Sequence, residues 1–474
     1  MIDTVRRVFL FRNVWAWVLI AVVLIGAAYL GSHASMRWLI LLVAGMGTVV
    51  LLQWPILGLM GLVLAALVVP LEFGTGTAVA VNPATLLVPT LLALWLLDMM
   101  RRGELRLVPS RTTRPLMLFL GAGLFSLLVG NALWDPSVPR SGDFTVVQLA
   151  QWAIFALSAG AFWLTGNLLR EKIWLRRLIF FFLAVAGSLA ILSVLSGDRD
   201  ALVRYRVVTT AVIRAPFWLL LAALAGGQLL FNEKLSVGWR LFLLVTLGGV
   251  LVYEFVFQQE AASHWVGVVA VMGVLAWLRW SRLRWPVVVL LLVLAGTGVL
   301  SSAVYGFAGG DAEWQESGTS RLSLTGRVLE VTMRNPITGL GPAAYRLYAR
   351  MKPLSSGRAL YIHPNVSSHN NYVDLFSHCG LLGLGLFLWF SVELAKLGLR
   401  LRTCFTEGFA AGYVNAMLAA GAGALTLMLL ADWILPFVYN IGFHGFQASV
   451  LVWLFLGGLV ALEQVAVRES EHYE

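Results

Sequence analysis

The chain has 474 residues, of which 59% are hydrophobic and only 12% are charged, and its formal net charge is +10. A soluble domain carries roughly 25% charged residues, so this composition excludes a water-soluble protein. Two cysteines exclude a disulfide scaffold and a cysteine metal cluster. The basic residues are spread between hydrophobic runs, so a nucleic-acid partner is not expected.

Apolar runs of about twenty residues recur along the chain, the length that an α-helix needs to cross a hydrocarbon core of about 30 Å. They exclude an outer-membrane barrel, whose strands would alternate apolar and polar residues. We predict an all-α polytopic membrane protein with about 12–14 transmembrane helices. The fourteen candidate spans are 14–31, 36–53, 55–70, 83–100, 115–133, 147–169, 173–195, 209–231, 239–257, 264–280, 285–304, 371–396, 409–432 and 444–463.

The positions of Lys and Arg predict which side of the membrane each connecting segment faces. With both termini in the cytoplasm, the inside segments hold 21 of the 34 basic residues. Eleven of the thirteen outside ones lie in two places, four of them before and into the span 209–231 and seven in the loop 305–370. This concentration indicates that something anionic binds outside the membrane.

The loop 305–370 is the largest segment between spans. It contains a stretch with helical spacing that starts near Arg321, followed by the helix breakers Asn335 and Pro336. The loop is too short for an independent domain and is expected to pack over a membrane cavity. We therefore divide the chain into transmembrane helices (1–304), an extracytoplasmic loop (305–370), and three further helices with a cytoplasmic tail (371–474).

The strongest local signal is His369, which lies at the end of this loop just before the span 371–396. An imidazole at the membrane–water boundary can be neutral at pH 7 and accept a proton. It could equally cap the helix or bond within the loop. Asp374, about one turn further on, could orient the imidazole or cap the helix, and Asn370 could support it. His363 could line the site or simply lie in the loop.

Arginines near the outer boundary form a second signal. Arg204 and Arg206 precede the span 209–231 and could extend to the interface. Arg214 lies within that span, where a charge costs at least about 2 kcal/mol and needs a partner. Arg321 and Arg327 lie on the predicted loop helix and could form a binding site or a solvated face.

Over residues 200–390 the chain resembles the bacterial O-antigen ligase and O-antigen polymerase superfamily. Four motifs of that family follow in order, namely Arg321, the turn Pro336-Ile337-Thr338-Gly339-Leu340-Gly341-Pro342, the run His369-Asn370-Asn371-Tyr372, and Gly380-Leu381-Leu382-Gly383. The family arginine lies about fifteen residues before the turn proline. Arg321 lies fifteen residues before Pro336, whereas Arg327 lies only nine residues before it. The resemblance therefore assigns the role of the family arginine to Arg321. The tryptophan that usually follows this arginine is absent.

The family also has an upstream arginine, followed about eight residues later by a Pro-Asn pair. Here Pro216 lies ten residues after Arg206 and two after Arg214, and no Asn follows it. Both arginines therefore remain candidates for this role.

The resemblance implies a GT-C-like glycosyltransferase of the bacterial inner membrane whose active site faces the periplasm. Its partners would be a glycan linked to undecaprenyl diphosphate, an acceptor glycan or glycolipid, and the lipid bilayer. His369 would take a proton from the acceptor hydroxyl in an inverting reaction. The arginines would bind the diphosphate, with Arg321 joined by the candidates Arg214, Arg206, Arg204 and Arg327. No cofactor and no metal are expected, because arginines would replace the usual divalent cation.

Several functions remain open. The fourteen spans favour a polymerase of O-antigen or exopolysaccharide, for which a chain-length regulator is a candidate partner. The alternatives are a ligase that transfers the glycan to lipid A core, a protein-O-glycosylating relative, and a transporter of polysaccharide or anions. Transport is the least favoured, because the notable charges lie at the outer edge and not at the membrane midplane. Near the last spans, Asp432, Tyr439 and His444 face outside and could bind sugar.

Overall fold

The computed structural model describes residues 47, 51, 53–74, 80–104, 106–198, 200–259, 261–286, 289, 293, 321–351 and 366–471. Contacts divide the chain into two compact units, Met1–Pro55 and Ile56–Glu474. In the first unit the described residues 47, 51 and 53 are helical. The predicted span 14–31 and most of the spans 36–53 and 285–304 lie outside the described residues.

The second unit is built of helices and one short antiparallel strand pair, in which Phe73 lies opposite Val81. From the N-terminal side the elements are α3 (Pro55–Leu67), β1 (Phe73–Gly74), β2 (Ala80–Val81), α4 (Pro83–Arg102), α5 (Thr113–Ala132), α6 (Phe144–Leu168), α7 (Lys172–Leu195), α8 (Ala201–Arg204), η1 (Thr210–Ile213), α9 (Ala215–Phe231), α10 (Val237–Val252), η2 (Tyr253–Phe257), α11 (Ala262–Arg279) and η3 (Ser281–Leu283). After residues outside the description follow α15 (Arg321–Thr332), α16 (Tyr345–Met351), α17 (Asn371–Cys404), α18 (Gly408–Leu427) and α19 (Gly442–Glu471).

Eight helices in the described part of the chain are long and apolar enough to cross a membrane, namely α4, α5, α6, α7, α10 with η2, α17, α18 and α19. Helices α3, α9 and α11 are apolar but shorter. These findings confirm the predicted all-α polytopic membrane protein. The predicted span 209–231 is divided at Arg214, whose extended backbone separates η1 from α9. Pro216 explains the boundary, because proline is accommodated in the first turn of a helix.

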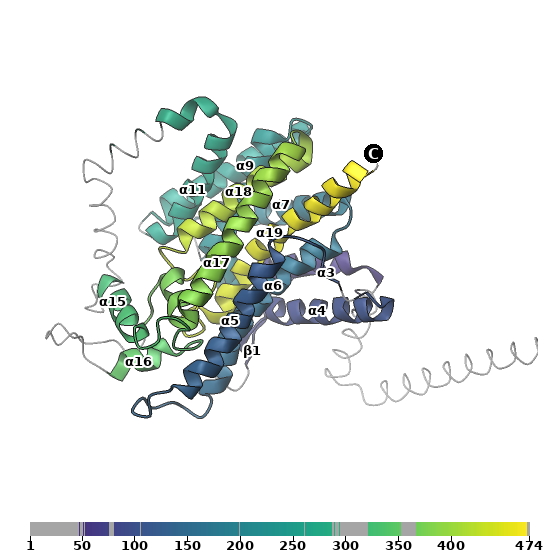
Figure 1. Cartoon of the computed structure of the whole chain (residues 1–474). Coiled ribbons are helices and arrows are strands. Elements are labelled where there is room, and N and C mark those ends of the chain that lie inside the picture. Colours follow the sequence, from purple (N-terminus) through teal and green to yellow (C-terminus); the bar gives the residue numbers. More distant parts are fainter. Residues whose placement is uncertain are drawn as a thin grey trace, which may run out of the picture. The chain divides into compact units, whose positions relative to one another are not determined.

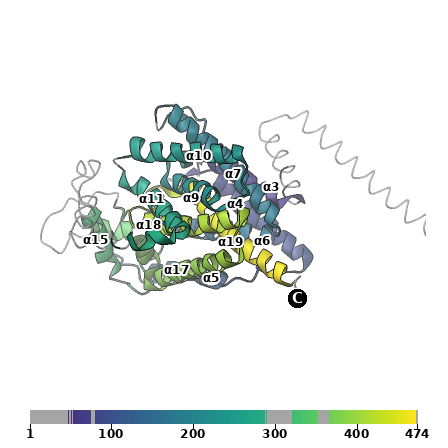
Figure 2. The same ribbon diagram turned by 90° about the horizontal axis from the view of Figure 1, so that it is seen from above.

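Helix α9 lies at the centre of the bundle. All its residues from 215 to 228 are buried, as expected for a helix that is hydrophobic on every side. It packs against α10, α11, α18 and α19, while α6 packs along α19 and α5 along α17. Figure 2 shows α9, α18 and α19 between α10 on one side and the pair α5 and α17 on the other.

Helix α17 breaks at Gly380, where φ is 67° and the backbone is not helical. The glycine-rich turn before α16 fills the break, since Leu381 N donates to Pro336 O over 2.9 Å and Leu382 N to Ile337 O over 3.1 Å. A Cβ added at Gly380 would lie 2.1 Å from Ile337 O. Only glycine allows both this φ and this approach. Two family motifs that lie about forty residues apart in the sequence therefore form one contact.

We expect Gly380→Ala to destabilise the protein by about 2 kcal/mol or more, because the new methyl group meets a backbone carbonyl and the positive φ is strained. Gly385, on the same helix, has open space around its Cβ. Gly385→Ala is the matched control and should be neutral or slightly stabilising, since alanine favours a helix by about 1 kcal/mol over glycine. Thermal unfolding in detergent measures both, and equal melting temperatures would contradict the expectation.

Candidate active site

The loop helices α15 and α16 lie against the N-terminal end of α17 (Figure 1). Thr332 Oγ1, at the end of α15, donates to Ser377 Oγ of α17 over 2.9 Å. In the turn that follows, Leu340 N donates to Ser377 O over 2.9 Å. These bonds fix the described part of the loop on the membrane helices, beside the residues that precede α17.

His369 lies in a tight turn just before α17, with a left-handed φ of 48°. The helix cap is supplied by Asn370 and not by His369, because Asn370 Oδ1 accepts from Tyr372 N (2.9 Å) and Val373 N (3.2 Å). Asn370 Nδ2 also donates to Leu429 O over 2.9 Å, which ties the turn to the end of α18. The His369 side chain keeps 19% of its surface exposed, so a substrate can reach it.

The carboxylate of Asp432 faces this imidazole, with 4.0 Å between His369 Nδ1 and Asp432 Oδ1. Asp432 is buried in the connection between α18 and α19, where it accepts hydrogen bonds from Phe437 N (3.1 Å) and Asn440 Nδ2 (2.9 Å). The distance exceeds that of a hydrogen bond. The contact between the two side chains is therefore electrostatic and not a hydrogen bond.

Arg214 brings a cation to the same place. Its guanidinium lies 5.2 Å above the ring of Trp433, the residue next to Asp432. An arginine stays charged in proteins, and Arg214 Nε is buried without a hydrogen-bond partner among the described residues. This guanidinium therefore has donor capacity for an anion.

The structure separates the three upstream arginines. Arg204 is exposed and pairs with Asp198 over 2.7 Å. Arg206 is exposed and has a left-handed φ of 54°. Of the three, Arg214 is the one whose guanidinium lies against Trp433, the residue next to Asp432.

A second arginine at the site, Arg346 on α16, was not singled out in the sequence. It is buried, and it donates through Nε to Val366 O (3.1 Å) and through Nη1 to Tyr439 O (3.0 Å). Its guanidinium lies over the rings of Phe437 (5.3 Å) and Tyr439 (4.8 Å). Burial lowers its pKa, which indicates a charge held away from water. The sequence feature that could have identified Arg346 is its position just after the glycine-rich turn.

Asp374 is buried beneath the turn that holds His369. Its Oδ1 accepts hydrogen bonds from Tyr345 of α16 (2.8 Å) and from Ser368 Oγ (2.7 Å). Burial and the charge of Asp374 raise the pKa of Tyr345 well above its ordinary value, so its hydroxyl remains a donor. Asp374 therefore connects α16 to the residue that precedes His369, whereas Asp432 is the carboxylate that faces the imidazole.

The remaining predicted residues belong to the loop. Arg327 is buried and donates through Nε to Ala349 O (3.1 Å) and through Nη1 to Glu330 (2.8 Å), so that it connects α15 to α16. Arg321 is the first residue of α15, and its side chain lies outside the description. His363 also lies outside the described residues. No three His, Cys, Asp or Glu side chains in the described ranges converge on a position that could hold a metal ion.

The fold and the site together define a polytopic α-helical membrane protein with an imidazole, a carboxylate, a buried arginine and a half-buried arginine at one end of its bundle. Residues 247–388 match the model of the O-antigen ligase family, which confirms the resemblance to the O-antigen ligase and polymerase superfamily. No curated protein matches the chain. The matched range contains His369, Arg346 and Arg327 but neither Arg214 nor Asp432. The family supports glycan transfer of the ligase or polymerase type, with lipid-linked substrates in a membrane.

Proposed function

We propose that the protein is an inverting glycosyltransferase that moves a glycan from undecaprenyl diphosphate to an acceptor hydroxyl at the outer face of the bacterial inner membrane. The observation that carries the proposal is the approach of His369, within the segment that matches the O-antigen ligase family, to Asp432, with the Arg214 guanidinium over the neighbouring ring of Trp433. An acid–base group beside fixed cations suits a reaction that deprotonates a hydroxyl and releases a diphosphate.

In the proposed reaction His369 accepts the proton of the acceptor hydroxyl as its oxygen attacks the anomeric carbon. Asp432 stabilises the imidazolium that forms, as a carboxylate does in related catalytic pairs. The new glycosidic bond forms on the face opposite the leaving group, so one displacement inverts the anomeric carbon. The diphosphate departs with the electron pair of the broken bond.

Arginines bind the departing diphosphate in this proposal. Arg346 is buried at the site and Arg214 is half-buried with its Nε buried, and forked charge-assisted hydrogen bonds suit phosphate oxygens. They neutralise the charge that develops as the diphosphate leaves, so the transfer needs no metal ion. Arg321 is proposed to join them from the start of α15, with Arg204, Arg206 and Arg327 as outer candidates.

The proposed orientation places the site in the periplasm and both termini in the cytoplasm. Helix α17 begins next to His369 and ends at Cys404, and basic residues gather in its last turns, at Lys396, Arg400 and Arg402. This asymmetry agrees with the excess of basic residues on cytoplasmic segments. We accordingly propose the loop 305–370 as the catalytic loop, between the helices of 1–304 and those of 371–474.

We favour a polymerase, whose acceptor is another lipid-linked repeat unit and whose product length a regulator protein could set. The second candidate is a ligase acting on lipid A core or, in a protein-glycosylating relative, on a protein hydroxyl. Transport of a polysaccharide or anion is less favoured, because residues 247–388 match the O-antigen ligase family and transport leaves the ordered motifs of that segment unexplained.

A transfer assay with the purified protein in detergent tests the function. Undecaprenyl-diphosphate-linked repeat units are supplied as the only glycan, with and without EDTA. We expect a ladder of lengthening products that persists in EDTA. A product that forms only after lipid A core is added would identify a ligase, and loss of products in EDTA would contradict metal independence. A protein that is inert with every acceptor would overturn the glycosyltransferase proposal in favour of transport.

A further inference from the structure

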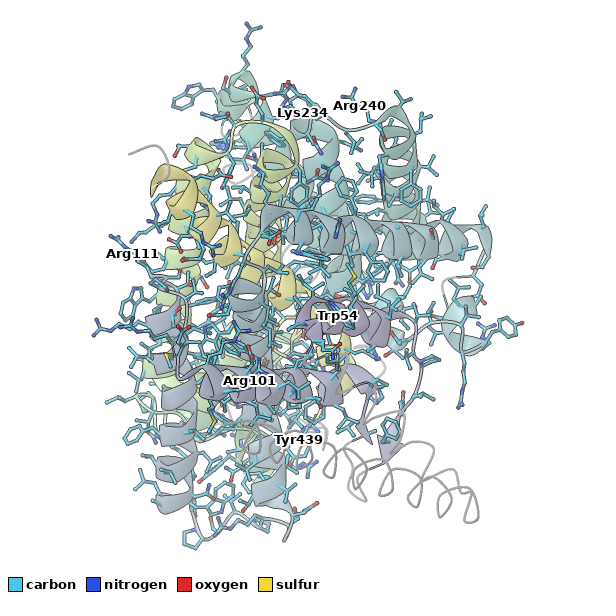
Figure 3. All side chains as sticks on the ribbon, turned by 90° about the vertical axis from the view of Figure 1, so that its right-hand side faces the viewer. Trp54, Arg101, Arg111, Lys234, Arg240 and Tyr439 are labelled. Atoms are coloured by element: carbon cyan, nitrogen blue, oxygen red, sulfur yellow. The ribbon has the colours of Figure 1, made fainter. Side chains whose placement is uncertain are left out.

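A polar cavity with a volume of about 710 Å³ lies at the end of the bundle opposite His369. Its walls come from the start of α7, the connection between α9 and α10, and the residues that join α17 to α18. Helix α17 leads from His369 to this cavity along its whole length of 34 residues. Figure 3 shows Lys234, which lines the cavity, near the top of the molecule, and Tyr439, which contacts Arg346 of the site, in the lower half.

The lining of this cavity is strongly cationic. It includes Lys172, Arg176, Arg177 and Lys234 but only one acidic side chain, Glu407. Glu407 and Lys234 form an ion pair at 3.5 Å in which both side chains are largely exposed, and such pairs contribute about 1 kcal/mol or less. Three positive charges remain in excess, so the cavity is suited to an anion.

Aromatic rings lie close to three of these cations, and the Arg177 guanidinium is 4.5 Å from the ring centroid of Trp174. Lys172 Nζ lies 5.2 Å from the ring centroid of Phe405, and the Arg176 guanidinium lies 5.8 Å from that of Phe180. Rings that attract a cation reduce the freedom of a long side chain. The cations are therefore partly ordered around the cavity before any ligand binds.

Asn232 supplies an unused acceptor in the same cavity. It is only 7% exposed, and its Nδ2 donates to Gln228 Oε1 over 2.7 Å. Its Oδ1 is buried and has no hydrogen-bond partner among the described residues. A buried acceptor without a partner costs about 1–3 kcal/mol, and a ligand with hydroxyl groups as well as an anion would satisfy it.

One wall of the cavity is apolar. Ile173, Phe180 and Trp239 line it, and the rings of Phe180 and Trp239 meet edge to face at 4.7 Å. Tryptophan is typical of the membrane–water boundary, and α7, α10 and α18, all long enough to span a membrane, start at this end. A lipid with its head group among the cations would lay its acyl chains along this wall, whereas a soluble phosphate would not use it.

We propose that this cavity binds the phosphodiester head group of an anionic phospholipid from the adjacent leaflet. The cations bind the phosphodiester oxygens, Asn232 Oδ1 accepts from a glycerol hydroxyl, and the chains lie beside Ile173 and Trp239. In the proposed orientation the leaflet is the cytoplasmic one, where anionic lipids attract basic pockets between helices. The site is separate from glycan transfer and does not depend on that function being correct.

Lipid binding by the delipidated, detergent-purified protein tests the proposal, measured by native mass spectrometry and by the melting temperature. Cardiolipin, phosphatidylglycerol and phosphatidylethanolamine are compared at equal concentration, with glycerol 3-phosphate and inorganic phosphate as soluble probes. We expect the two anionic lipids to bind and stabilise the protein, and the other three compounds to have little effect. Arg176→Gln/Arg177→Gln should weaken binding of the anionic lipids by about 10- to 30-fold.

Arg101→Gln/Arg102→Gln is the matched control, because it removes two adjacent arginines at a helix terminus that do not line the cavity. Arg176 and Arg177 lie in the first two turns of α7, where positive charge is unfavourable, so their loss should not weaken the helix. The proposal would be overturned if both double variants lost the same affinity for the anionic lipids. It would also be overturned if phosphatidylethanolamine bound as tightly as the anionic lipids. If inorganic phosphate raised the melting temperature as much as cardiolipin does, the ligand of this cavity would be a soluble phosphate and not a lipid.

Discussion

Replacing His369 by asparagine is expected to lower the rate of glycan transfer by about 10²- to 10⁴-fold, the contribution typical of a positioned general base. Asparagine tolerates the left-handed φ of 48° at this position, so the turn before α17 should be kept. It cannot take the proton of the acceptor hydroxyl. The measurement is the initial rate of transfer by the purified variant, together with its melting temperature.

His444→Asn is the comparison for this prediction, because the sequence offered His444 as a sugar-binding candidate and not as a base. His444 lies near the start of α19, and its Nδ1 is 3.4 Å from a carboxylate oxygen of Glu72, so it combines an imidazole with a carboxylate away from Asp432. Its replacement should change the rate less than about threefold, an order of magnitude below the effect of a general base. A His369→Asn protein that is folded and retains most of the wild-type rate would show that His369 is not the base.

Replacing Arg214 by glutamine should lower the rate of transfer by about 10²- to 10³-fold, the size of effect seen when one donor to a developing negative charge is removed. The loss should appear mainly in kcat, because the charge on the diphosphate grows as the bond breaks. Arg214→Lys keeps the positive charge but loses the planar guanidinium that can donate two parallel hydrogen bonds. We therefore expect its rate to lie between those of Arg214→Gln and the wild type. Steady-state kinetics with the lipid-linked donor separate kcat from KM.

Arg204→Gln and Arg206→Gln are matched controls, since both arginines are exposed and lie within ten residues of Arg214. Each should lower the rate only a few-fold, as expected for outer charges screened by solvent. If Arg206→Gln lowered the rate of transfer more than Arg214→Gln does, Arg206 and not Arg214 would be the upstream arginine that binds the diphosphate. Equal small losses in all three would remove this segment from the diphosphate site.

Local patterns in the sequence were enough to predict parts of the site. The Gly-Leu-Gly-Pro turn and the Gly380 motif were recognised separately, and the structure joins them because each needs the close approach that glycine allows. His369 was identified from its place before a hydrophobic helix. The helix cap was assigned to the wrong residues, because His369 and Asp374 were the candidates and Asn370, a residue type preferred at that position, supplies the cap.

Arg346 and the role of Asp432 could not be predicted in this way. Asp432 had been noted only as a sugar-binding candidate, and it lies 63 residues after His369 in the chain. The choice between Arg206 and Arg214 also stayed open in the sequence, because the spacing to Pro216 fits neither. Motif spacing describes residues that are close in the sequence. Arg214, Arg346 and Asp432 are far apart in the sequence and come together only because helices such as α9, α18 and α19 pack against one another.

The sequence by itself determined that this is a helical membrane protein, because only apolar runs of that length satisfy both the hydrocarbon core and the backbone hydrogen bonds. It also determined where tight backbone contacts occur, because proline fixes φ and glycine allows φ values that other residues rarely adopt. The tertiary structure alone decided which charges face each other. Electrostatic interaction depends on distance through space and on burial, and the packing of helices such as α9 and α17 sets both.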